Sequence, residues 1–119
     1  MEEKRFGHIL ENWEAAKAEM RTILIALAKN RQTISYSDLS LQVQTIYISH
    51  RSQMMYAMLT DIHQEDEAQN RPGLATLVVR KSDGRPGPGY FAGIDDADWE
   101  AYWQREFDKV CSYWEAQDG

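Results

Sequence analysis

Cysteine is almost absent from this chain, and that scarcity limits its chemistry. A single cysteine, Cys111, among 119 residues excludes an internal disulfide and a zinc site built from several cysteines. Cys111 falls in the apolar run of a helix expected near the end of the chain, so we expect a buried small hydrophobic residue. A reactive catalytic thiol is the less favoured interpretation.

Long hydrophobic runs are missing as well. No segment approaches the roughly 20 consecutive apolar residues that a membrane span requires. The first six residues, MEEKRF, contain acids and lack the apolar centre of a signal peptide. We therefore expect a cytoplasmic protein, in its own cell or in the host of a phage, with no membrane partner.

The chain has fewer basic than acidic residues, and its formal net charge is −6. This charge argues at first against a nucleic-acid partner. The distribution is uneven, however, because acids dominate residues 57–70 and the part after residue 86. Between them lies a short basic segment with Arg71, Arg80, Lys81 and Arg85. The chain thus has a basic centre between two acidic segments.

What the sequence does contain is enough apolar residues, 43%, for one globular domain of this length. Three- and four-residue spacing predicts a first helix from Ile9 to about Asn30, with Lys17, Glu19 and Arg21 facing water. After an extended piece at 32–34, Ser35 and Asp38 form a capping-box pattern that starts a short second helix. A third helix is expected after Ser49, with Met55, Met58, Leu59 and Ile62 inside, and with an end at residues 70–73.

The second half predicts a β-hairpin and a final helix. Residues 74–81 are expected to form a strand, the dipeptide at 83–84 a tight turn, and Tyr90–Phe91 a short return strand. A helix is then expected from Asp95 or Asp98. Its apolar stripe comprises Trp99, Trp103, Phe107, Val110 and Trp114.

This order of elements predicts an α+β, mostly helical fold: a winged helix-turn-helix with an additional C-terminal helix. We expect a single domain over 1–119, with the first helix at 1–30, the helix-turn-helix and wing at 31–93, and the C-terminal helix at 95–116. The aromatic stripe would most simply pack on the first helix. The alternative is a homodimer interface formed by Trp99, Trp103 and Trp114.

A winged helix contacts DNA with the start of its third helix and with its wing. Candidate contact residues by this criterion are Arg31, His50, Arg51, Ser52, Gln53, Arg80, Lys81 and Arg85. Arginine pairs with guanine and glutamine with adenine, whereas serine and histidine serve phosphates. The alternative is that these residues are the polar groups of any helix start and the solubilising bases that flank a strand.

The Pro/Gly loop at 84–89 is the most unusual local composition. Its glycines allow a close approach to a ligand, so it could present Arg85 and Tyr90 to a phosphate or a partner. It lacks the Gly-Lys-Ser/Thr helix start of a nucleotide-binding loop. The other interpretation is a stiff wing tip that buries Tyr90 and Phe91.

The run Thr33 to Leu39, followed by a helix, by Pro72 and by the strand Leu77 to Arg80, resembles the winged-helix domain of DNA alkyltransferase-like proteins. That family shares a Thr-Tyr-Gly-type helix start, an arginine on the recognition helix and a valine strand before a glycine-containing loop. The resemblance covers residues 31–93 and implies the fold and a DNA-facing helix that bears Arg51. The family's Pro-Cys-His-Arg active site has no counterpart, since Cys111 lies on another element, so alkyl transfer is not implied.

No catalytic constellation emerges from the sequence. His63 and Glu67 are spaced to share a helix face as metal ligands, but an exposed helix end usually carries such residues as solvated charges. We expect no enzyme activity, no cofactor and no metal. The predicted function is a small DNA-binding or regulatory accessory protein that reads DNA through the third helix and wing. The alternative is a protein-interaction module, such as an acidic adaptor or an inhibitor of a nucleic-acid-handling partner.

Overall fold

The computed structural model describes residues 4–5, 8–49, 52–82, 84–85 and 99–117, and the side chains of all of these except 4–5, 8–9 and 99. The expected contact residues His50 and Arg51 lie outside this part of the chain. So do the return strand predicted at Tyr90–Phe91 and the helix starts considered at Asp95 and Asp98.

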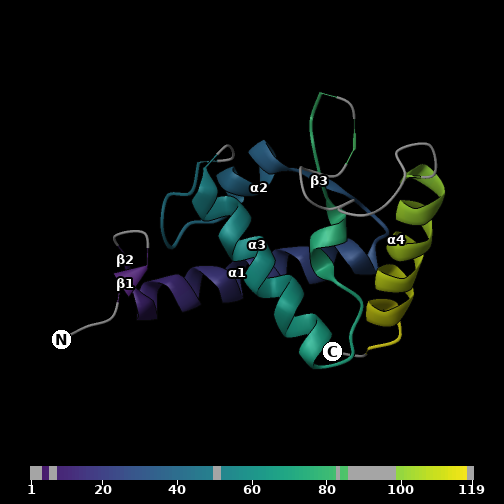
Figure 1. The fold of residues 1–119 in the computed structure, drawn as a ribbon, viewed down its shortest axis with the longest axis horizontal. Coiled ribbons are helices and arrows are strands. Elements are labelled where there is room, and N and C mark those ends of the chain that lie inside the picture. Colours follow the sequence, from purple (N-terminus) through teal and green to yellow (C-terminus); the bar gives the residue numbers. More distant parts are fainter. Residues whose placement is uncertain (1–3, 6–7, 50–51, 83, 86–98, 118–119) are drawn as a thin grey trace.

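The protein is mostly helical, with two very small sheets (Figure 1). The elements in chain order are β1 (Lys4–Arg5), β2 (His8–Ile9), α1 (Leu10–Lys29), β3 (Ile34–Ser35), α2 (Tyr36–Gln42), α3 (Gln53–Ala68), the 3-10 helix η1 (Leu74–Leu77), β4 (Val78–Val79) and α4 (Trp99–Glu115). β1 and β2 pair antiparallel, and β3 pairs in parallel with β4, with Ile34 opposite Val78. The prediction of a mostly helical α+β fold is confirmed.

The long helix α1 buries one stripe along its length. Trp13, Ala16, Met20, Leu24 and Ala28 are all fully buried, at spacings of three and four residues. The predicted helix is thus confirmed, although its start is wrong by one residue, because Ile9 belongs to β2. None of the helices described combines the length and apolar character needed to cross a bilayer.

Serine side chains cap the next two helices. The hydroxyl of Ser35 accepts a hydrogen bond from the backbone N–H of Asp38 at 3.1 Å, which confirms the predicted start of α2. Ser52 caps α3 in the same way, because its hydroxyl accepts from the N–H of Met55 at 3.2 Å. The third helix therefore begins at Gln53, later than the start expected directly after Ser49.

The strand predicted over residues 74–81 is wrong at its beginning. Leu74–Leu77 form η1, and only Val78 and Val79 are extended. Leu74 and Leu77 are both fully buried. A strand would point them to opposite faces, whereas residues three apart in a 3-10 helix lie on the same side.

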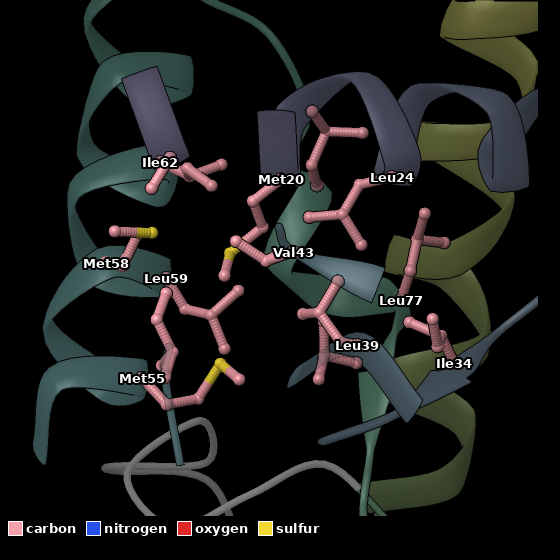
Figure 2. Close-up of a cluster of buried hydrophobic side chains, with 14 of the residues drawn as sticks. Met20, Leu24, Ile34, Leu39, Val43, Met55, Met58, Leu59, Ile62 and Leu77 are labelled. Atoms are coloured by element: carbon pink, nitrogen blue, oxygen red, sulfur yellow. The ribbon is translucent and has the colours of Figure 1, made fainter. Parts of the chain in front are cut away.

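One hydrophobic cluster joins all of the helices. Met20 and Leu24 of α1 and Leu39 of α2 lie between the inner stripe of α3 and Leu77 (Figure 2). Phe107, Val110 and Cys111 of α4 complete the cluster. Cys111 is buried, and this burial raises the pKa of its thiol; the expectation of a buried cysteine is confirmed.

A carboxylate on α1 holds the connection between α2 and α3. Glu19 accepts hydrogen bonds from the backbone N–H groups of Gln44 and Thr45 at 2.9 and 3.0 Å, and from the hydroxyl of Thr45 at 2.9 Å. The bond from the N–H of Thr45 and that from Gln44 together hold the pKa of Glu19 below its ordinary value, against the effect of desolvation. Ionised Glu19 therefore stabilises the folded state.

We predict that Glu19→Gln lowers the free energy of unfolding at about pH 7 and that this effect shrinks as the pH falls below 4.5. A carboxyl group with a lowered folded-state pKa stabilises the protein above its ordinary value of 4.5 and stops doing so as the pH falls through the folded-state pKa. Urea unfolding of both proteins at several pH values measures the difference. A difference that does not depend on pH would contradict the proposed role of the ionised form.

Candidate nucleic-acid interface

The start of α3 presents one of the expected contact residues to solvent. Gln53 is the first helical residue and is exposed, and its amide makes no hydrogen bond within the described part of the chain. Ser52 precedes it, but the Ser52 hydroxyl is occupied: besides accepting from Met55, it donates to the carbonyl of Ser49 at 2.7 Å. Ser52 thus positions the helix start, and Gln53 is its free hydrogen-bonding group.

The basic residues after β4 lie on a closed turn, here called the Arg80–Arg85 turn. The N–H of Arg80 donates to the carbonyl of Arg85 at 2.7 Å, and the N–H of Gly84 donates to the carbonyl of Arg80 at 2.8 Å. Gly84 has a φ of +70°, a left-handed conformation that favours glycine. Arg80 and Lys81 are exposed and Arg85 is half-buried, so the turn projects a group of cations.

The start of α3 and the Arg80–Arg85 turn are both toward the top of the view in Figure 1, with α2 between them. Both segments were predicted to carry contact residues.

Arg31 belongs to a different part of the structure. Its guanidinium pairs with Asp108 at 3.3 Å and with Glu115 at 2.9 Å, and it donates to the hydroxyl of Ser112 at 3.1 Å. All three partners are on α4, so Arg31 holds α4 against the end of α1.

The tryptophans of α4 face the body of the protein. The indole N–H of Trp103 donates to the carbonyl of Thr76 at 3.0 Å, and its ring stacks on Phe107 with centroids 4.9 Å apart. Trp114 is half-buried and packs against the same core, with Arg71 6.0 Å above its ring. These contacts fit the simpler expectation, in which the stripe packs within the chain; the side chain of Trp99 lies outside the described part.

The acidic run near the end of α3 is turned inward. Glu65 accepts from Lys17 and from Arg21, the latter at 2.9 Å. The expectation that Lys17 and Arg21 face water is wrong, because both reach across to α3. Burial opposes ionisation of Glu65, but the hydrogen bonds from these two cations outweigh it and hold the pKa of Glu65 below its ordinary value.

Asp66 is the centre of this network and is fully buried. Its carboxylate accepts from Arg21 at 2.7 Å, from Arg71 at 3.2 Å and from the backbone N–H of Leu74 at 2.9 Å. One residue therefore joins α1, α3, the segment after α3 and η1. One turn earlier, Asp61 accepts from the indole N–H of Trp13 at 3.0 Å.

With Asp61, Glu65 and Asp66 engaged by residues of α1, α3 exposes an uncharged surface ahead of Glu67. The residues Gln53, Tyr56, Thr60 and Gln64 are exposed at spacings of three and four, and we call them the α3 outer stripe. The ring of Tyr56 packs edge-on against Tyr36 of α2, with centroids 5.6 Å apart. Only Gln53 was selected from the sequence. Tyr56 lies outside the buried Met55–Ile62 stripe in the sequence pattern, and this position is the signal that could have identified the other exposed residues of α3.

The pair His63 and Glu67 forms an ion pair at 2.7 Å on the surface. Within the described residues, no three His, Cys, Asp or Glu side chains are grouped so that they could hold a metal ion.

Comparisons with known protein families, with curated proteins and with solved structures find no match to this chain. The α3 outer stripe and the Arg80–Arg85 turn are the two exposed surfaces whose chemistry bears on the function.

We predict that Asp66→Ala lowers the free energy of unfolding by about 3–5 kcal/mol, since the part-buried guanidinium of Arg71 and the N–H of Leu74 lose their acceptor and Arg21 keeps only Glu65. Chemical denaturation followed by tryptophan fluorescence measures the change. Glu67→Ala is the matched control, because this neighbouring carboxylate is 68% exposed and its loss should cost no more than about 0.5 kcal/mol. Equal effects of the two substitutions would show that the buried network is not what holds α3 in place.

Proposed function

We propose that this chain is a cytoplasmic winged helix-turn-helix protein with an additional C-terminal helix, and that it binds duplex DNA through α3 and the Arg80–Arg85 turn. The order α1, β3, α2, α3 and β4 agrees with the order of elements in a winged helix up to the wing. The finding that carries the proposal is the inward pairing of the acids of α3. It leaves an exposed helix face with hydrogen-bonding groups and no carboxylate over its first three turns.

The two surfaces supply the two kinds of contact that DNA binding needs. Cationic side chains on the turn suit the phosphate backbone, which gives affinity without sequence preference. The α3 outer stripe suits base edges in the major groove, which accommodates an α-helix. The net charge of −6 is a sum over the whole chain, whereas the described residues of the turn contribute the cations Arg80, Lys81 and Arg85.

We predict salt-dependent binding to duplex DNA of arbitrary sequence, and weaker binding for Arg51→Ala and for Arg85→Ala. Each substitution that removes a phosphate contact should reduce the slope of log affinity against log salt by about 1. Fluorescence anisotropy with a labelled duplex over a salt series measures this. Lys109→Ala is the control, because this exposed lysine lies on α4 and pairs with Glu106; its salt slope should equal that of the wild type.

Failure to bind at about 50 mM salt with micromolar protein would rule out the proposal, since nonspecific dissociation constants are typically about 10⁻⁴–10⁻⁶ M even at physiological salt. Equal losses for Lys109→Ala and Arg85→Ala would place the contact elsewhere on the surface.

A protein-interaction module is the second candidate, and one observation favours it. Leu41 and Tyr47 are 74% and 80% exposed, and both lie next to the segment that Glu19 holds. Large apolar side chains presented on an ordered segment are typical of protein contacts.

On this hypothesis, the double substitution Leu41→Ser and Tyr47→Ser removes partner binding and leaves the free energy of unfolding within about 0.5 kcal/mol of the wild type. Co-purification with the wild-type protein, compared with the double variant and with Lys109→Ala, provides the measurement. A partner retained by the double variant would contradict the assignment of this surface.

A further inference from the structure

The α3 outer stripe has a composition that is selective among the four base pairs. Gln53, Tyr56 and Thr60 occupy its first two turns, all exposed and all uncharged. Gln53 and Thr60 make no side-chain hydrogen bond to any described residue, so their polar atoms are available to a ligand.

We infer that α3 recognises A·T base pairs in the major groove, with the Gln53 amide on adenine and with Tyr56 and Thr60 against thymine methyl groups. The inference rests on the proposed DNA binding and adds the class of sequence that is bound. A glutamine amide matches the N6 donor and N7 acceptor of adenine, while apolar groups and the methyl of threonine contact the C5-methyl of thymine.

Over the first three turns of α3, the described residues of the stripe carry none of the groups that favour G·C pairs. Guanine is read by arginine or lysine and cytosine by a carboxylate; Arg51, just before the stripe, lies outside the described part of the chain. Three acids of α3 are engaged elsewhere: Asp61 accepts from Trp13, and Glu65 and Asp66 are paired with the cations of α1 and Arg71. Glu67, at the end of α3, is the acid of this helix that is largely exposed, at 68%.

Tyr56 is held in place before any ligand arrives. Its ring packs on Tyr36 with an interplanar angle of 62°, and 37% of the residue remains exposed. A ring held by a neighbouring helix loses little conformational freedom on binding, so it provides a fixed apolar surface for a methyl group.

The experiment has two stages. Binding of the wild-type protein is first measured with an arbitrary duplex over a salt series, and a randomised duplex library is then selected for tight binding. We expect enrichment of A·T pairs. Replacement of thymine by uracil in the selected site removes only the methyl groups, and each contacted position should weaken binding about fourfold, the factor given by the burial of one methyl group.

Tyr56→Ala is expected to remove the discrimination between thymine and uracil at one position, and Gln53→Ala to relax the preference for adenine at another. Tyr102→Ala on α4 is the matched control and should retain both preferences. The thymine-to-uracil exchange on the wild-type protein needs no variant, so the test holds even if Tyr56→Ala does not fold.

The outcomes distinguish the inference of A·T recognition from the proposal of DNA binding. Salt-dependent binding with no A·T enrichment, with G·C enrichment, or with equal affinity for thymine and uracil would overturn the inference and leave DNA binding standing. The absence of binding to every duplex would overturn both.

Discussion

The arrangement of this protein depends on the hydrogen bonds and ion pairs that the buried carboxylate of Asp66 makes. A fully buried charge is tolerated only when it is paired and hydrogen-bonded, so Arg21, Arg71 and the N–H of Leu74 must all meet at this residue. Their convergence fixes the rotation of α3 about its axis and holds the start of η1 against α3. The exposed face of α3 is therefore determined by a contact on its opposite side.

The same pairing changes how the charge of the chain should be interpreted. The net charge of −6 already includes both members of every ion pair, so internal pairing leaves the sum unchanged and affects only where the charges lie. Lys17 and Arg21 pair with Glu65 and Asp66, and Arg31 pairs with the acids of α4. Arg80 and Lys81 of the Arg80–Arg85 turn are exposed.

Local features were predictable from the sequence, and features that depend on distant partners were not. The cap at Ser35, the buried stripe of α1 and the break after α3 all follow from residues within one or two turns of each other. The inward direction of Lys17 depends on Glu65, 48 residues away, and η1 forms where Leu74 meets Asp66. For the same reason Gln53 and the basic turn were predicted as contact sites and Tyr56 could be placed outside the buried stripe, whereas the exposed face that includes Thr60 became recognisable only once the rotation of α3 was known.

The place of α4 bears on whether the face of α3 is available to a partner. Through Arg31 and Trp103, α4 is attached to the end of α1 and to η1, and in Figure 1 it stands across the end of α1, on the side away from the start of α3. The additional helix thus covers apolar surface on α1 and η1 without covering the α3 outer stripe. An exposed stripe whose polar atoms are unpaired costs nothing in water, but it gives no stability to the fold either. The stripe therefore remains open to a partner, and its composition is not explained by the requirements of folding.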